Sequence, residues 1–403
     1  MNPDLDLLQP YPFQKIAVLM EGVKPADKPM VSFAIGEPKH PTPNIILDAM
    51  QDNLSGLASY PLTKGNDALR LVIANWLTQR FHLPADTINP DKHILPVNGT
   101  REALFAFAQA VVDKTKTNPQ VLMPNPFYQI YEGAAFLAGA EPVYLPCTEQ
   151  TGFNPDFDAV PDKTWDNCQL LYLCSPGNPT GAVVPEQQIR KLLALAEKHD
   201  FIIASDECYS EIYFDEGKPP VGLLEVAAKS GNTEFKRCLV FHSLSKRSNA
   251  PGLRSGFVAG DANIIEKFLL YRTYHGCAMP PPTQAASIVA WQDETHVLDN
   301  RNQYREKFDA VLKILSPVMN VQKPEASFYL WAGLDGSGID DEAFTRQIYA
   351  QEHVKVVPGS YLSRKANGLN PGEKRIRMAL VATLDECIEG ANRIAKFLSS
   401  NPH

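Results

Sequence analysis

Short apolar runs alternate along the chain with amphipathic segments of helical spacing. The runs at residues 170–174, 201–204 and 239–241 have the length and composition of buried strands. Between the first two runs, apolar residues recur three and four positions apart, as on one face of a helix: Ile189, Leu192, Leu193 and Ala196. Similar units extend from about residue 95 to about residue 260. This alternation predicts an α/β fold with a mostly parallel sheet covered by helices.

Prolines mark where predicted elements begin and end. Pro185 is expected at the first position of the helix before residue 201. The run Met279-Pro280-Pro281-Pro282 interrupts the chain, because proline ends helices and disrupts sheet interiors. A long helical stretch follows, from near Thr283 to Leu315. A chain of 403 residues, 44% of them hydrophobic, is long enough for two cores, so we expect two domains: a large one at 46–284 and a smaller α+β one formed by 1–45 and 285–403.

Polar residues follow each of the three apolar runs. Asn178 comes after the first run, Asp206 and Tyr209 come after the second, and Lys246 comes after the third. In open α/β sheets, ligands bind in a crevice at the carboxyl ends of the strands. We therefore expect these four side chains to meet in one crevice.

Lys246 has neighbours that suit covalent chemistry beside a phosphate. Ser243 and Ser245 flank it, and Arg254 follows eight positions later. Partial burial lowers the pKa of a lysine so that it can attack an aldehyde, while hydroxyls and a guanidinium bind phosphate oxygens. The segment fits a lysine that forms a Schiff base with a phosphate-bearing aldehyde. Taken alone, it fits a solvated loop of serine, lysine and arginine equally well.

Pyridoxal phosphate needs the groups that the three strand ends supply. Asp206 would keep the pyridine nitrogen protonated, because an opposite charge at close range shifts a pKa by about 1–3 units. A protonated ring stabilises negative charge on the α-carbon of the substrate. Asn178 and Tyr209 can donate hydrogen bonds to the phenolic oxygen of the cofactor. We therefore expect pyridoxal 5'-phosphate as the cofactor, with Lys246, Asp206 and Tyr209 as catalytic residues.

Four segments carry a resemblance to a known family. The chain resembles the class I/II aminotransferases of PLP fold type I in the order and spacing of Asn178-Pro179-Thr180-Gly181, Asp206-Glu207-Cys208-Tyr209, Ser243-Leu244-Ser245-Lys246 and Gly252-Leu253-Arg254. The resemblance extends over essentially the whole chain. It implies the fold of that family, a large parallel-sheet domain with a smaller domain formed by the two chain ends.

The same resemblance implies further cofactor-binding residues. Gly99, Thr100 and Arg101 match the loop whose backbone N–H groups bind the phosphate at a helix start, where N–H groups are unpaired. Tyr128 matches an aromatic ring that stacks on the pyridine face. Tyr60 matches a tyrosine that reaches the phosphate of the neighbouring subunit, which implies a homodimer with shared sites.

Substrate-binding residues are also implied by the resemblance. Gly36 matches a glycine whose backbone lies against the substrate carboxylate, and Arg377 matches the arginine that binds this carboxylate together with Asn178. Arg375 is the neighbour that could be confused with Arg377, because alternation puts both on one face of a strand. The implied reaction is ping-pong transamination between amino acids and 2-oxo acids, with Lys246 moving the α-proton.

The substrate is suggested by three longer segments. Residues 32–43, 95–99 and 242–257 are similar to succinyldiaminopimelate transaminases of bacterial lysine biosynthesis. This similarity implies N-succinyl-LL-2,6-diaminopimelate as the amino donor and 2-oxoglutarate as the acceptor. The aspartate-specific branch of the family has an arginine shortly before a Pro-Pro run, whereas residues 274–279 contain none. Arg247 and Lys39 are candidates for the succinyl arm, and solvated charge is an equally good interpretation of each.

Three alternatives stay open. The first is an aspartate or broad-range aminotransferase. The second is a PLP-dependent lyase, because one fold hosts several reactions. The third is a non-enzymatic PLP-fold regulator, for which a DNA-binding domain would have to be found in the chain.

Composition excludes several classes of protein. The net charge of −8 argues against a nucleic-acid-binding surface, which would be basic. The seven cysteines form no C-x-x-C pair, and the nine histidines show no metal-ligand spacing, so we expect neither disulfides nor a metal site. No run approaches the roughly 18 apolar residues of a membrane-spanning helix. The first residues lack an export signal, and we expect a cytoplasmic location.

Overall fold

A seven-stranded sheet forms the centre of the computed structural model, which describes residues 1–335 and 338–400. Both pairings of β8 are antiparallel and the other pairings are parallel. This confirms the predicted α/β architecture. In spatial order the strands are β2 (Ile94–Val97), β8 (Gly256–Gly260), β7 (Cys238–Ser243), β6 (Ile202–Asp206), β5 (Cys168–Cys174), β3 (Gln120–Asn125) and β4 (Glu141–Pro146).

Helices cover both faces of this sheet. On one face, Leu171 and Ile203 pack against α3 (Asp67–Arg80), α8 (Glu186–His199), α9 (Leu223–Lys229) and α12 (Pro281–Gln292). On the other face, Leu170 and Ala204 pack against α5 (Thr100–Val111), α6 (Ile130–Leu137) and α11 (Ala262–His275). A strand buried on both sides has no polar face, which explains why the central strands are continuous apolar runs.

Two helix predictions differ in detail from the structure. Pro185 is the residue before α8 rather than its first residue, and Asp200 ends the helix in the left-handed conformation, with φ 58°. The long stretch predicted after Pro282 is two helices, α12 and α13 (Thr295–Leu315). The prediction of one stretch was wrong because Asp293 leaves the helical conformation and its carboxylate accepts a hydrogen bond from the N–H of His296, at 2.9 Å.

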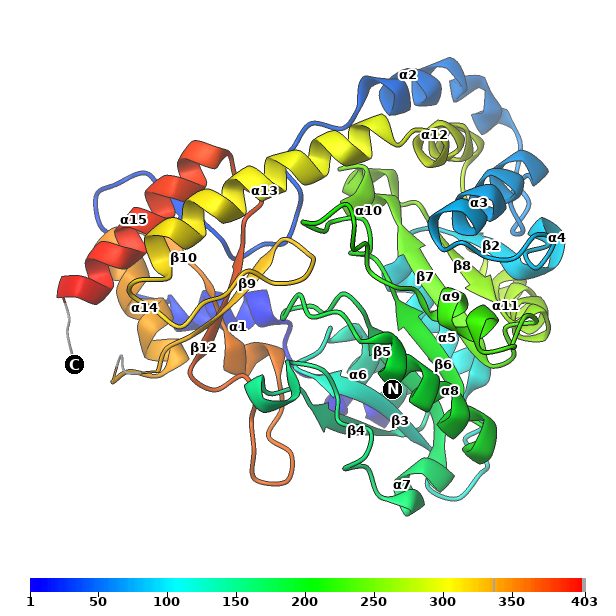
Figure 1. The fold of residues 1–403 in the computed structure, drawn as a ribbon, viewed down its shortest axis with the longest axis horizontal. Coiled ribbons are helices and arrows are strands. Elements are labelled where there is room, and N and C mark those ends of the chain that lie inside the picture. The colour runs from blue at the N-terminus through cyan, green and yellow to red at the C-terminus, as the bar shows by residue number, and fades with distance from the viewer. Residues whose placement is uncertain (336–337, 401–403) are drawn as a thin grey trace.

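A second unit combines the two ends of the chain. Its three-stranded antiparallel sheet has the order β11 (Val357–Pro358), β12 (Arg375–Ala379), β9 (Tyr329–Gly333). Next to it, β1 (Val31–Ser32) pairs in parallel with β10 (Val354–Lys355). Figure 1 shows α13 as the long helix leading from α12 toward α14 (Asp341–Glu352) and α15 (Leu384–Ser400). One core joins Phe33, Phe308, Ile376 and Ile394. The exact domain limits stay a prediction.

The remaining elements are short. The α-helices are α1 (Pro12–Leu19), α2 (Asn44–Asp52), α4 (Pro90–His93), α7 (Asp162–Asn167) and α10 (Leu244–Arg247). The 3-10 helices are η1 (Pro3–Leu7), η2 (Leu54–Ala58), η3 (Glu149–Thr151), η4 (Pro251–Leu253) and η5 (Gly359–Leu362). Within residues 1–335 and 338–400, no helix combines the length and apolar character needed to cross a membrane.

Candidate active site

A cavity of about 460 Å³ opens where β5, β6 and β7 end. Parallel pairing brings the carboxyl ends of these strands together, as the sequence predicted. The cavity is lined by most of the residues proposed from the sequence: Gly36, Thr100, Arg101, Tyr128, Asn178, Asp206, Tyr209, Ser243, Ser245, Lys246, Arg254 and Arg377. Gly99 and Tyr60 are the two that do not line it.

Lys246 enters the cavity from α10, the short helix that begins directly after β7. Ser243 caps this helix, since its hydroxyl accepts a hydrogen bond from the N–H of Ser245 at 3.1 Å. The Nζ of Lys246 donates to the carbonyl oxygen of Gly36 at 2.6 Å. Burial lowers the pKa of Lys246 to about 8, because desolvation disfavours the charged amine. A substantial fraction of the amine is therefore neutral near physiological pH, as Schiff-base formation requires.

Asp206 is buried at the last position of β6. Its carboxylate accepts hydrogen bonds from the Tyr131 hydroxyl at 2.7 Å and from the N–H of Cys208 at 3.3 Å. Both donors are neutral, and burial raises the pKa of Asp206. A buried carboxylate of this kind is stabilised by a cation, and the protonated pyridine nitrogen of pyridoxal phosphate is one.

A corner rich in hydrogen-bond donors lies at the start of α5. Gly99 has φ 86°, and a Cβ added to it would lie 2.2 Å from Nη2 of Arg254, so only glycine lets the guanidinium approach. Arg254 donates to the carbonyl oxygens of Pro251 at 2.9 Å and Asn98 at 3.4 Å. With the N-terminus of α5 and the Ser243 hydroxyl, this corner has the donors that a phosphate needs.

Arg377 faces the cavity from β12. Its Nη1 donates to Oδ1 of Asn178 at 3.2 Å and its Nη2 donates to the carbonyl oxygen of Ala34 at 2.8 Å. Its buried Nε has no hydrogen-bond partner among residues 1–335 and 338–400, which leaves a donor available for a substrate carboxylate. Arg375 is instead paired with Glu149 at 2.7 Å and does not line the cavity. The structure thus distinguishes Arg377, which lines the cavity, from Arg375, which does not.

Arg101 and Tyr128 lie together at the cavity wall. The Nε of Arg101 donates to the Tyr128 hydroxyl at 2.7 Å, and its Nη2 donates to the Tyr11 hydroxyl at 3.4 Å. Burial raises the pKa of Tyr128, so its hydroxyl stays protonated. Arg247 and Lys39, the candidates for a succinyl arm, do not line the cavity. Arg247 is buried and paired with Glu294.

Three tyrosines beside the predicted residues were missed by the sequence reasoning, and two of them, Tyr329 and Tyr11, line the cavity. Tyr131, which donates to Asp206, follows Tyr128 by three positions, and this spacing was a usable signal. Tyr329 lines the cavity, with its hydroxyl oxygen 3.1 Å from that of Tyr209, but the two residues are 120 positions apart. Tyr11 comes from the segment before α1 and has no local signal either.

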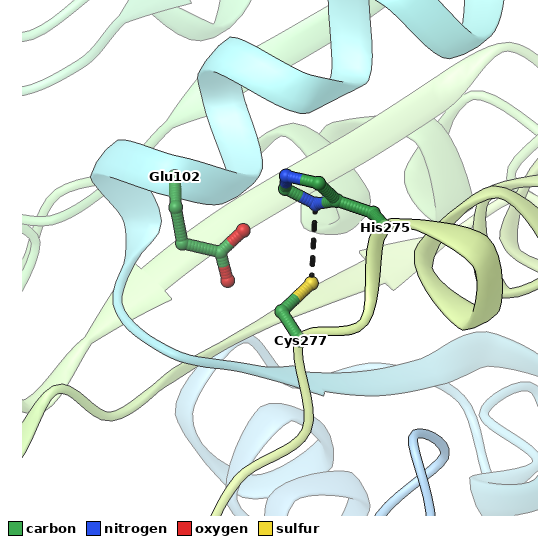
Figure 2. Close-up of side chains that lie close together, drawn as sticks. All are labelled: Glu102, His275 and Cys277. Carbon is green, nitrogen blue, oxygen red and sulfur yellow. Dashed lines mark hydrogen bonds between the residues drawn. The ribbon is translucent and has the colours of Figure 1, made fainter.

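A potential metal-ligand cluster lies outside this cavity. Figure 2 shows Glu102 on α5 next to His275 and Cys277, whose ligand atoms all lie within 4.8 Å of one another. His275 Nδ1 is 3.3 Å from the Cys277 sulfur. Both carboxylate oxygens of Glu102 are already engaged, one by the N–H of Asn98 and the other by Arg272 at 2.7 Å. The buried Arg272 cation therefore already neutralises the Glu102 carboxylate, which a metal ion would need as a ligand.

Comparison with known proteins decides the family. Residues 28–394 match the family described as "Aminotransferase class I and II". The chain belongs to this family. Pyridoxal 5'-phosphate is therefore its cofactor, and when bound it supplies the electron sink for chemistry at the α-carbon of amino acids.

Similar proteins agree on aminotransferase chemistry. An LL-diaminopimelate aminotransferase of Nitratidesulfovibrio vulgaris is 31% identical over 396 residues, which cover 97% of each chain. An aminotransferase from Neisseria meningitidis Z2491 has a TM-score of 0.94 and 47% identity, covering 98% of this chain and 100% of its own. Aminotransferase AspB from Helicobacter pylori 26695 has a TM-score of 0.88 and 35% identity, covering 97% of this chain and 99% of its own.

The lowered pKa of Lys246 predicts how the aminotransferase takes up its cofactor. Mixed with pyridoxal phosphate between about pH 6 and pH 10, cofactor-free protein should bind it at a rate that reaches half its maximum near pH 8. An ordinary lysine would give a rate still rising at the upper end of this range. Growth of the cofactor absorbance measures the rate, and borohydride reduction followed by peptide mapping locates the attachment.

Two variants control this experiment. Lys246→Arg should abolish trapping, while Lys236→Arg, a change of an exposed lysine outside the cavity, should leave the pH profile unchanged. Reduction that placed the cofactor on another lysine would show that the assignment of Lys246 is wrong.

Proposed function

We propose that this aminotransferase moves the amino group of N-succinyl-LL-2,6-diaminopimelate to 2-oxoglutarate. Both substrates carry carboxylates at two ends, so the site needs a cation for each end. Arg377 supplies one of them. The observation that carries the proposal is Arg101, which lines the same cavity and pairs with tyrosine hydroxyls rather than with any carboxylate of the described residues. Its guanidinium is available for a distal carboxylate.

The diaminopimelate part of the proposal has two supports. A relative with 31% identity carries the name LL-diaminopimelate aminotransferase. Residues 32–43, 95–99 and 242–257 resemble the transaminases that act on the succinylated donor. The first and third of these segments contribute residues to the cavity wall, namely Ile35, Gly36, Glu37, Ser243, Ser245, Lys246, Pro251 and Arg254.

The predicted site residues have the following proposed tasks. Lys246 holds the cofactor and moves the proton at the α-carbon, for which its pKa of about 8 is suitable. Asp206 holds the pyridine nitrogen, and Tyr209 donates to the phenolic oxygen together with Asn178. The phosphate is bound by the start of α5 with Ser243, Ser245 and Arg254, and Tyr128 stacks on the ring. Arg377 binds the α-carboxylate against the backbone of Gly36.

A second candidate donor is LL-diaminopimelate without the succinyl group. The name of the relative favours it. Glu37 also favours it, because this exposed carboxylate lines the cavity and would attract the free distal ammonium, which the succinylated donor lacks.

We also propose a homodimer with shared sites. Tyr60 is fully exposed and does not line the cavity of its own chain. Exposed apolar side chains surround it in sequence, namely Leu54, Leu57 and Leu62, and such groups are typical of subunit contacts.

The seven cysteines are free thiols, in keeping with a reducing cytoplasmic location.

A donor panel tests the substrate assignment. With 2-oxoglutarate as the acceptor, the succinylated diaminopimelate should have a kcat/KM at least about tenfold above that of aspartate or alanine. Alanine has no distal carboxylate and the chain of aspartate is short, so polar groups placed for the long donor would be left unpaired. Formation of glutamate is the measurement. A higher kcat/KM for unsuccinylated LL-diaminopimelate would select the second candidate, and a preference for aspartate would contradict both.

Arg101→Gln tests the second cation. The KM for 2-oxoglutarate should rise about 10- to 100-fold, because a hydrogen bond to a charged group contributes about 1.5–3 kcal/mol. The KM for pyruvate, which lacks a distal carboxylate, should stay within about twofold. Arg375→Gln is the matched control outside the cavity and should change neither value. Equal losses for both acceptors would refute the distal role of Arg101.

Tyr60 should act across the subunit interface. Tyr60→Phe should weaken cofactor retention about 10- to 100-fold by removing one hydrogen bond to the charged phosphate. Hybrid dimers made from Tyr60→Phe and Lys246→Ala subunits should regain roughly half of the wild-type turnover, because one of their two sites is intact. Hybrids no more active than the Tyr60→Phe dimer would contradict the sharing.

A further inference from the structure

Tyr329 contacts both halves of the proposed site. It is the first residue of β9, is 3% exposed and lines the cavity. Its hydroxyl oxygen is 3.1 Å from that of Tyr209. The Arg377 guanidinium lies over its ring, 4.5 Å from the ring centre. One side chain thus touches the residue proposed for the phenolic oxygen of the cofactor and the residue proposed for the substrate carboxylate.

The ring of Tyr329 has little freedom to move. A Cβ added to Gly36 would lie 2.0 Å from its hydroxyl oxygen, so this oxygen fills the space beside the Gly36 backbone. Phe328 packs edge-on against the ring, with centroids 4.7 Å apart, and the ring of Tyr209 does so at 5.6 Å. Packing of this density fixes the direction of the hydroxyl and the position of the ring face.

We propose that Tyr329 is a positioning residue whose hydroxyl orients Tyr209 toward the cofactor and whose ring face holds Arg377 in place for the substrate carboxylate. The inference rests on the functions proposed above for Tyr209 and Arg377. The direction of the hydrogen bond follows from chemistry. Tyr209 has a single O–H, and when this O–H points at the phenolic oxygen of the cofactor, its own oxygen can only accept. Tyr329 is then the donor.

Two consequences follow from the two contacts. A hydroxyl that accepts a hydrogen bond becomes a better donor, so Tyr329 strengthens the bond from Tyr209 to the phenolic oxygen. A guanidinium held over an aromatic ring is stabilised by the ring electrons, so Tyr329 restricts Arg377 to the geometry that suits a carboxylate. The hydroxyl therefore affects the cofactor, whereas the ring affects substrate binding.

Tyr329→Phe removes the hydroxyl and keeps the ring. In the purified holoenzyme, the absorbance of the bound cofactor is followed as the pH is changed. The pH at which this absorbance change is half complete, its midpoint, should rise by about 0.3–1 unit. The sign follows because weaker donation by Tyr209 leaves more negative charge on the phenolic oxygen, and that charge holds the nearby proton of the cofactor more tightly. The KM values for donor and acceptor should stay within about twofold, because the cation–ring contact is intact.

Tyr329→Leu removes both contacts. It should shift the absorbance midpoint as Tyr329→Phe does, and it should also raise KM about 3- to 30-fold, equally for 2-oxoglutarate and for whichever donor is turned over. Equal change is expected because every substrate presents the same α-carboxylate to Arg377. A residue that only supports the fold would instead lower the unfolding temperature and alter both readouts together in both variants.

Tyr304→Phe is the matched control. Tyr304 is a buried tyrosine that packs against Phe328, as Tyr329 does, and its hydroxyl has no hydrogen-bond partner in the described part of the chain. Its change should move neither the midpoint nor KM. An unchanged midpoint in Tyr329→Phe, or a KM in that variant as high as in Tyr329→Leu, would overturn the proposal. A different amino donor would change the proposed function but would leave these expected shifts as they are.

Discussion

Parallel pairing of β5, β6 and β7 is the constraint on which the site depends. In a parallel sheet the strands end at the same edge, so the residues that follow them are neighbours whatever their distance in sequence. Cys174 pairs with Asp206, and Asp206 pairs with Phe241. The loop with Asn178, the Asp206 carboxylate and the helix α10 with Lys246 therefore lie at the same edge of the sheet. The topology of the sheet therefore brings these residues together, although they are far apart in sequence.

The second unit completes the cavity from the other side. Gly36 and Arg377 come from the two ends of the chain and meet the strand ends of the large sheet. The connection between the units also runs close to the lysine, because Asn300 on α13 donates to the carbonyl oxygen of Lys246 at 3.3 Å and accepts from Asn249 at 3.1 Å. The helix that links the units therefore fixes the backbone that presents the amine.

Sequence reasoning was strongest where local pattern and topology agree. Apolar runs at β5, β6 and β7 predicted strands buried on both faces, and the polar residues after them predicted the crevice. Arg377 could be named only through resemblance, because its environment is built from Ala34, Asn178 and Tyr329, which are distant in sequence. The break between α12 and α13 was missed because Asp293 leaves the helical conformation and its carboxylate contacts His296, a polar interaction that no apolar pattern reveals.

The pairing of the chain ends has a consequence for how the enzyme is made. Arg377 donates to the carbonyl oxygen of Ala34, 343 positions earlier, and β1 pairs with β10. During synthesis from the N-terminus, the large sheet has all of its strands long before residue 377 leaves the ribosome, whereas residues 31–36 must wait for their partners. Contacts of such long range close slowly. The part of the cavity proposed for the substrate carboxylate therefore cannot be complete in a nascent chain that already contains the strand ends proposed for the cofactor.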